Sequence, residues 1–158
     1  MTMGESGTLH HTCYVVQDIE KMAKSLAESL AIRPWNFWTI EPAATTVYGK
    51  VVPFSFRLAL AQVGGSSLEL IAPDSGESIY VKHLETKGEG FHHNCIAYAT
   101  LDEMHRAKEE LDKQGRKMAQ SGSLGELGEF CYFDIPEISA ALELLYLKEL
   151  PPPEKTLT

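Results

Sequence analysis

Apolar and polar positions alternate along the chain in two units that follow the same order. In each unit a short apolar strand precedes an amphipathic helix and three further strands, which we predict over residues 8–73 and 90–148. Asp18 is placed to cap the first of these helices, and Thr100 with Glu103 forms a capping box before the second. The pattern therefore predicts two βαβββ modules.

The stretch that opens each unit occurs twice. Residues 9–22 read LHHTCYVVQDIEKM, residues 91–104 read FHHNCIAYATLDEM, and the two align without a gap. Two His-His-x-Cys motifs, at the same place relative to two strand-to-helix transitions, indicate an internal duplication. A duplication of this kind predicts paired sites.

One module cannot bury both faces of a four-stranded sheet by itself. We therefore predict an α+β fold in which two curved sheets pair around a cleft, with the helices outside. Residues 1–158 would form one domain, with a connector at 74–89 that contains a short helix. The tail at 149–158 contains three consecutive prolines, and we expect it to be flexible.

Composition narrows the possible partners. The formal net charge is −8, which argues against nucleic acid or an anionic membrane as a partner, since both would need a basic face. The N-terminus lacks the basic and apolar regions of a signal peptide, and no apolar stretch is long enough to span a bilayer, so we expect a cytoplasmic protein. Cys13, Cys95 and Cys131 are expected to be small buried residues.

Each unit also carries one glutamate inside its last apolar strand. Glu69 stands in LELIAP and Glu143 in LELLYL. A buried carboxylate is costly unless it is paired with a cation or bound to a metal. For one such glutamate, a Lys or Arg partner or a solvent-facing position is the simpler interpretation, but the repeated pattern favours a metal site.

One histidine of each pair is expected to face the cleft. Period-2 alternation places His11 with Cys13 on one face of the first strand and His10 on the other, and it separates His93 from His92 in the same way. Periodicity alone does not say which face is inside. Two histidines and two glutamates related by a pseudo-twofold axis would form a ligand set for one divalent ion, such as Co, Ni, Zn or Mn.

These motifs resemble those of the vicinal oxygen chelate superfamily, which includes glyoxalases, bleomycin-resistance proteins and extradiol dioxygenases. The resemblance covers the chain from about Leu9 to Leu147. The connector is most similar to that of the methylmalonyl-CoA epimerase branch, in Ser78-Ile79, Lys87-Gly88 and Gly90-Phe91-His92-His93. The resemblance implies that the metal ligands are His11, Glu69, His93 and Glu143.

The resemblance also implies a function. It points to a metal-dependent isomerase that abstracts a proton α to a carbonyl and stabilises the enolate on the metal, with Glu143 as the base and Glu69 as the second candidate. The substrate would be an acyl-CoA, as for methylmalonyl-CoA epimerase, and the protein would be a homodimer. A lyase like glyoxalase I, acting on a hemithioacetal of glutathione, is the alternative. A metal-free binding or resistance protein is a further alternative.

Three positions distinguish the enzymes of this superfamily. Epimerases typically carry Gln at the position of Glu69, whereas bacterial glyoxalase I has Glu there. Epimerases also place a second general base in the strand where this chain has FSFRLAL, and Arg57 or a neighbour is the nearest counterpart. Val15 stands where glyoxalase I has an arginine for the glutathione carboxylate.

Overall fold

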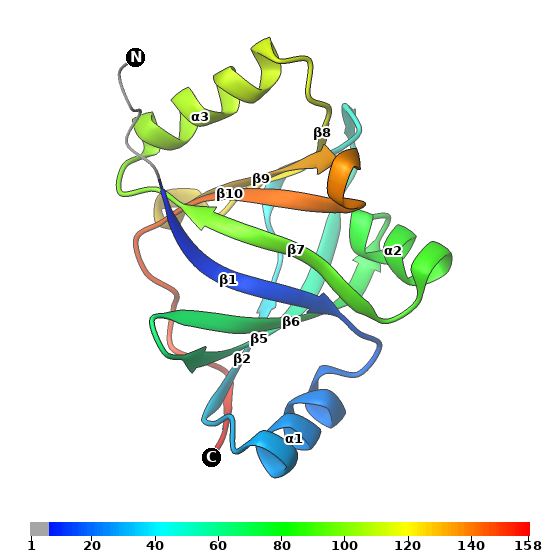
Figure 1. The fold of residues 1–158 in the computed structure, drawn as a ribbon, viewed down its shortest axis with the longest axis vertical. Helices are drawn as coiled ribbons and strands as arrows, with labels where there is room; N and C mark the ends of the chain where they lie inside the picture. The colour runs from blue at the N-terminus through cyan, green and yellow to red at the C-terminus, as the bar shows by residue number, and fades with distance from the viewer. Residues whose placement is uncertain (1–6) are drawn as a thin grey trace.

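Eleven strands form one curved, unclosed sheet in the part of the chain that the computed structural model describes, residues 7–158 (Figure 1). The helices are α1 (Ile19–Leu30), α2 (Ile79–Lys87) and α3 (Leu101–Lys113), with short 3-10 turns at Gly125–Leu127 and Pro136–Ile138. The strands are β1 (Thr8–Val15), β2 (Trp35–Ile40), β3 (Ala43–Val47), β4 (Lys50–Val51), β5 (Phe54–Val63), β6 (Ser66–Gly76), β7 (Gly90–Ala97), β8 (Met118–Ser123), β9 (Gly128–Ile135), β10 (Ala140–Leu147) and β11 (Lys155–Leu157). Residues 1–6, which belong to the predicted domain and N-terminus, lie outside the described residues.

The two predicted modules lie mostly in opposite halves of this sheet, but β3 and β4 of the first module extend the half formed by the second, because β3 pairs with β8. The strand order is β11-β2-β5-β6-β1-β7-β10-β9-β8-β3-β4. Strand β1 runs parallel to β6, β7 runs parallel to β10, and β1 and β7 pair antiparallel at the centre. The predicted α+β class with two curved sheets is confirmed, and the two sheets are continuous through the β1–β7 pair.

Side chains of successive residues point to opposite faces of the sheet and so build separate cores. On β5, Phe56 and Leu58 join an inner core, whereas Ala59 and Ala61 pack outside, in the core that α1 covers. Helix α3 covers a third core on the outer face of β9 and β10. Helices α1 and α3 lie at opposite ends of the sheet in Figure 1, and α2 lies at its side. Helix α2 contributes Tyr80 to the inner core.

The helices are short and begin as predicted. The Asp18 carboxylate accepts a hydrogen bond from the backbone N–H of Lys21 at 3.0 Å, and both bonds of the capping box between Thr100 and Glu103 are present. Helices α1, α2 and α3 have 12, 9 and 13 residues. Within residues 7–158, none of the helices has the length and apolar character needed to cross a membrane.

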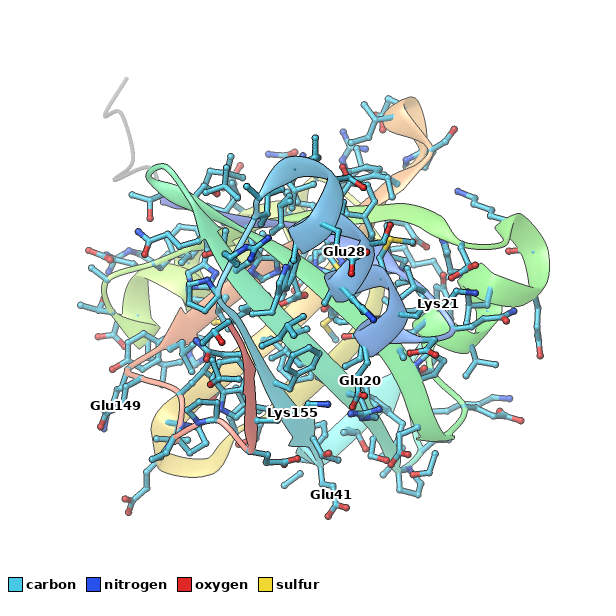
Figure 2. The ribbon with its side chains drawn as sticks, turned by 90° about the horizontal axis from the view of Figure 1, so that it is seen from below. Glu20, Lys21, Glu28, Glu41, Glu149 and Lys155 are labelled. Carbon is cyan, nitrogen blue, oxygen red and sulfur yellow. The ribbon has the colours of Figure 1, made fainter. Side chains whose placement is uncertain are left out.

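The expectation of a flexible tail at 149–158 is wrong for its last part. Residues 155–157 form β11, which pairs antiparallel with the edge strand β2. The indole N–H of Trp38 donates to the carbonyl of Pro151 at 2.8 Å, and the Lys155 ammonium lies 3.1 Å from the Glu20 carboxylate. Figure 2 shows Glu20 and Lys155 close together beside α1. The tail is ordered because β2 offers an unpaired edge, which composition alone does not reveal.

Candidate metal centre

Each histidine pair lies at an irregularity of the central strand pair. The register between β1 and β7 shifts by one residue at His10 and again at His92, so each pair contains a β-bulge. A bulge interrupts the alternation of faces, so both histidines of a pair can point inward. His10 and His11 both line the inner cavity, so the expectation that only one histidine per pair faces the cleft is wrong for the first pair, because it assumed unbroken alternation.

The second histidine of each pair meets the two glutamates at the centre of the inner core. The Nε2 atoms of His11 and His93 are 3.2 Å apart. Glu143 Oε2 lies 3.0 Å from each of these nitrogens, and Glu69 Oε1 lies 3.2 Å from that of His11 and 3.6 Å from that of His93. The structure thus brings together all four residues that the sequence singled out as candidate ligands.

Burial makes this cluster electrostatically unusual. The four residues are each 5% exposed or less. Burial disfavours the imidazolium form of His11, but the Glu69 and Glu143 carboxylates outweigh this effect and raise its pKa to about 10. Burial likewise opposes ionisation of the carboxyls, yet the contacts with His11 and His93 lower the pKa of Glu69 and that of Glu143. In the absence of metal, the cluster therefore holds a proton between its carboxylates and His11 at neutral pH.

The cluster fits a small divalent cation. Glu143 Oε2 is buried and has no hydrogen bond of good geometry, although both histidine nitrogens lie within 3.0 Å of it. One ligand atom from each of the four residues can be chosen so that all lie within 4.8 Å of one another. Neighbouring ligand atoms are about 3.0 Å apart in an octahedral site and about 3.4 Å apart in a tetrahedral site when the bonds are about 2.1 Å long. The observed spacings match those values, so these side chains could hold one metal ion.

The first histidine of each pair contacts the second. His10 Nδ1 lies 2.7 Å from His11 Nδ1, and His92 Nδ1 lies 2.7 Å from His93 Nδ1. If Nε2 of the second histidine binds a metal, its Nδ1 carries the proton and donates to the first histidine. Such outer hydrogen bonds orient ligand imidazoles. His10 and His92 are therefore candidates for orienting the candidate ligands.

Two cysteines also contact the candidate ligands, a role that the sequence analysis missed. Cys13 lies opposite Glu69 in the β1–β6 pair, and Cys95 lies opposite Glu143 in the β7–β10 pair. Burial together with the nearby carboxylate charges raises the pKa of both thiols. The signal was present in the sequence, because the cysteine recurs in both copies of the motif.

Arg57, at or next to the position expected for the second base of epimerases, lies away from this cluster. Its guanidinium donates to the Glu20 carboxylate at 2.9 Å on the outer side of the sheet, beside α1. Its neighbours Phe56 and Leu58 line the inner cavity instead. Val15 is fully buried in the inner core.

A cavity of about 50 Å³ lies beside the cluster and opens to solvent. His11, Glu69 and Glu143 form part of its wall, and His10 lies on the wall as well. A metal-binding cluster at the wall of such a cavity is the arrangement expected of a metalloenzyme.

Comparison with known families agrees with this arrangement. The model of the Glyoxalase/Bleomycin resistance protein/Dioxygenase superfamily matches residues 10–133, which is most of the chain. The chain therefore belongs to this superfamily, and the predicted membership is confirmed. None of the curated proteins matches the sequence.

Solved structures share the fold over nearly the whole chain. A hypothetical protein from Bacillus halodurans C-125 is 20% identical, with a TM-score of 0.69 and coverage of 93% of this chain and 99% of that one. Methylmalonyl-CoA epimerase from Mycobacterium tuberculosis is 18% identical, with a TM-score of 0.64 and coverage of 94% and 93%. A methylmalonyl-CoA epimerase in complex with methylmalonyl-CoA and NH4+ has the same identity and TM-score, with coverage of 94% and 100%. At these identities the similarity establishes the fold.

Proposed function

We propose that this protein is a metal-dependent isomerase that removes a proton from the carbon next to a carbonyl group, in the manner of methylmalonyl-CoA epimerase. The observation that carries the proposal is the buried cluster of two histidines and two glutamates at the wall of an apolar cavity. His11, Glu69, His93 and Glu143 are the proposed metal ligands. The fold shared with the epimerases supports the choice of reaction.

The proposed cofactor is one divalent ion, and two nitrogen and two carboxylate ligands suit Co, Ni, Zn or Mn. When bound, such an ion supplies a Lewis acid that polarises a substrate oxygen and so makes the neighbouring carbon more acidic. The chain itself supplies the buried, preorganised ligand set. Cys13 on β1 and Cys95 on β7 lie opposite its two glutamates in the neighbouring strands. A metal-free binding protein is disfavoured, because without a metal ion two buried carboxylates would face a single protonated histidine, His11.

Glu143 is the proposed general base, and Glu69 is the second candidate. Both carboxylates form part of the cavity wall, where a substrate proton would be within reach. Among the described residues that line the cavity, these two are the only carboxylates. The cavity thus offers no counterpart of a separate second base, so proton return to the opposite face of the substrate should be slow.

A lyase of the glyoxalase I type is the second candidate function. The favouring observation is Glu69, which completes the His, Glu, His, Glu set that the resemblance assigns to bacterial glyoxalase I. Its substrate would be a hemithioacetal rather than an acyl-CoA. Both reactions begin with removal of a proton α to a carbonyl, so one experiment covers both.

We also propose a homodimer that uses the outer face of the central strands. Leu9, Tyr14 and Phe91 on this face are 49%, 36% and 41% exposed, and the rings of Tyr14 and Phe91 are in edge contact. Figure 1 shows no helix in front of β1 and β7. Light scattering tests this proposal: the wild type should have twice the chain mass, and Tyr14→Glu should be monomeric.

Deuterium exchange tests the proposed reaction. Metal-loaded protein in deuterated water should place deuterium at the α-carbon of methylmalonyl-CoA if it is an epimerase, and should turn over only the methylglyoxal–glutathione hemithioacetal if it is a lyase. Glu143→Gln should slow exchange by roughly 10²- to 10⁴-fold, since it removes the base. Glu149→Gln, which changes an exposed glutamate, is the matched control. If metal-loaded protein acts on neither compound, both specific assignments are wrong.

A further inference from the structure

The wall of the cavity is almost entirely apolar. Apart from the three cluster residues, His10 and Tyr132, every lining side chain is aliphatic or a phenylalanine. The apolar lining residues are Ile40, Phe56, Leu58, Leu60, Ile71, Leu124, Phe130, Leu145, Leu147 and Leu150. The hydroxyl groups of Tyr132 and Tyr80 form a hydrogen bond of 2.7 Å, and Tyr132 is only 1% exposed. Tyr132 therefore adds little polar surface to the cavity.

Both halves of the sheet contribute to this apolar wall. Phe56, Leu58 and Leu60 alternate along β5 in the first half, and Leu145 and Leu147 continue the alternation from Glu143 along β10 in the second. Leu150 adds a side chain from the tail, which the Trp38 bond to Pro151 holds against the sheet. The apolar wall is therefore a property of the whole fold and not of one loop.

Among the residues that the structure describes, no lysine or arginine lines the cavity. Arg57, on the same strand as Leu58, points outward to Glu20, and Lys155 meets the same carboxylate. A carboxylate or phosphate of a substrate placed against the apolar wall would lose its hydration without gaining a partner, which is strongly unfavourable. An apolar group in the same place would gain free energy in proportion to its buried area.

We infer that the substrate carries a small uncharged apolar group, which occupies this cavity beside the four candidate metal ligands. This inference rests on the proposed function, because it assumes that the substrate binds at the His11, Glu69, His93 and Glu143 cluster. It excludes a substrate that places a carboxylate or phosphate against the apolar wall of the cavity. A charged carrier such as a CoA or glutathione moiety must then lie outside the apolar wall.

Hydroxamates test this inference, because they present two adjacent oxygens to a divalent ion and can carry any acyl chain. Binding of acetohydroxamate, butyrohydroxamate and hexanohydroxamate to the metal-loaded protein is measured by calorimetry. Affinity should rise roughly fourfold for each methylene that the cavity buries. Adipic acid monohydroxamate, which replaces the terminal methyl of hexanohydroxamate by a carboxylate, should bind roughly tenfold or more weakly than hexanohydroxamate.

Two variants locate the effect in the cavity. Leu150→Ala should weaken binding of hexanohydroxamate and leave that of acetohydroxamate unchanged, whereas Glu149→Ala, at the exposed neighbouring position, should change neither. Leu147→Lys should reverse the preference in favour of adipic acid monohydroxamate, because it adds a cation to the wall. Gln62→Lys adds the same charge at an exposed position and should not reverse the preference.

The outcomes separate this inference from the proposed function. If metal analysis finds an ion and acetohydroxamate binds, but affinity is flat with chain length or favours the carboxylate, the apolar-group inference is overturned and the metal centre stands. If the protein holds no metal and binds no hydroxamate, the proposed function fails and this inference fails with it. A rising series that Leu150→Ala flattens supports both.

Discussion

The two halves of the molecule repeat the same local chemistry in different surroundings. In both, a bulge lies at the first histidine, the second histidine reaches the centre, and a cysteine contacts the glutamate of the adjacent parallel strand. The first histidines differ, however. His10 is half-buried on the cavity wall, whereas His92 is 6% exposed and contacts the rings of Tyr80, His83 and Tyr132.

This difference arises from the connector between the halves. Only one connector is needed to join two units, so α2 occurs once, and it covers the His92 side through Tyr80 and His83. His10 lies on the wall of the inner cavity instead. The two copies of the His-His-x-Cys motif therefore share the contacts that their own strands determine. They differ in their surroundings because α2 packs beside only one of them.

The largest expected effect tests the equivalence of the two central histidines. His11→Ala and His93→Ala should each reduce metal content from about one ion per chain to nearly none, because each removes one of only four protein ligands. Elemental analysis of purified protein measures this. His105→Ala, on α3, removes a histidine that pairs with Glu129 instead and is the control. Retention of metal by either ligand variant would contradict the proposed set.

The pH dependence of the metal-free protein should reveal the proton held in the cluster. The pKa of His11 is raised from 6.5 to about 10 in the folded protein, so its stabilising contribution is complete below pH 6.5 and is lost as the pH rises towards 10. The lowered pKa values of Glu69 and Glu143 give a contribution that is present above pH 4.5 and lost below it. The melting temperature of chelator-treated protein should therefore be highest between pH 4.5 and 6.5.

Metal should reverse the alkaline part of this profile. Metal binding displaces the proton of His11, so metal affinity should increase as the pH rises towards 10. Metal-loaded protein should accordingly keep its melting temperature where the metal-free protein loses it. Parallel alkaline profiles for the two forms would show that the cluster does not bind the ion.

A smaller effect should distinguish His10 from His92, the first histidines of the two pairs. His92→Ala leaves the Nδ1 atom of His93 without its partner in a buried place, so it should weaken metal binding by roughly 10- to 100-fold. The same change should lower the free energy of unfolding by about 1–3 kcal/mol. His10→Ala should have a weaker effect, because water in the cavity can replace the half-buried imidazole. Competition with a metal-binding dye measures metal affinity, and urea denaturation measures the free energy of unfolding. Equal losses in the His92→Ala and His10→Ala variants would contradict the proposed difference between the two histidine pairs.

The smallest effect is expected at Arg57, which has a role only on the outer face of the first half. Its ion pair with Glu20 joins side chains that are 40% and 43% exposed, so Arg57→Ala should cost less than about 1 kcal/mol of stability. Metal content and deuterium exchange should remain at the wild-type level. A large loss of exchange would mean that Arg57 acts on the substrate.

Local patterns in the sequence determined much of the fold and of the candidate site. Glu69 and Glu143 are identified as candidate ligands because each stands inside an otherwise apolar strand and the pattern recurs in both units. Capping residues identify the starts of α1 and α3. The duplication of the His-His-x-Cys motif adds the two histidines as candidate partners of those glutamates.

Only the tertiary structure decided how these parts combine. The bulges at His10 and His92 depend on the pairing of β1 with β7, and the order of the tail depends on the free edge of β2. The apolar cavity is likewise formed by side chains that are distant in sequence, such as Phe56 and Leu150. The physical reason is that a strand's own sequence sets its alternation, whereas register shifts, edge pairing and cavity walls are set by partner segments that local periodicity does not specify.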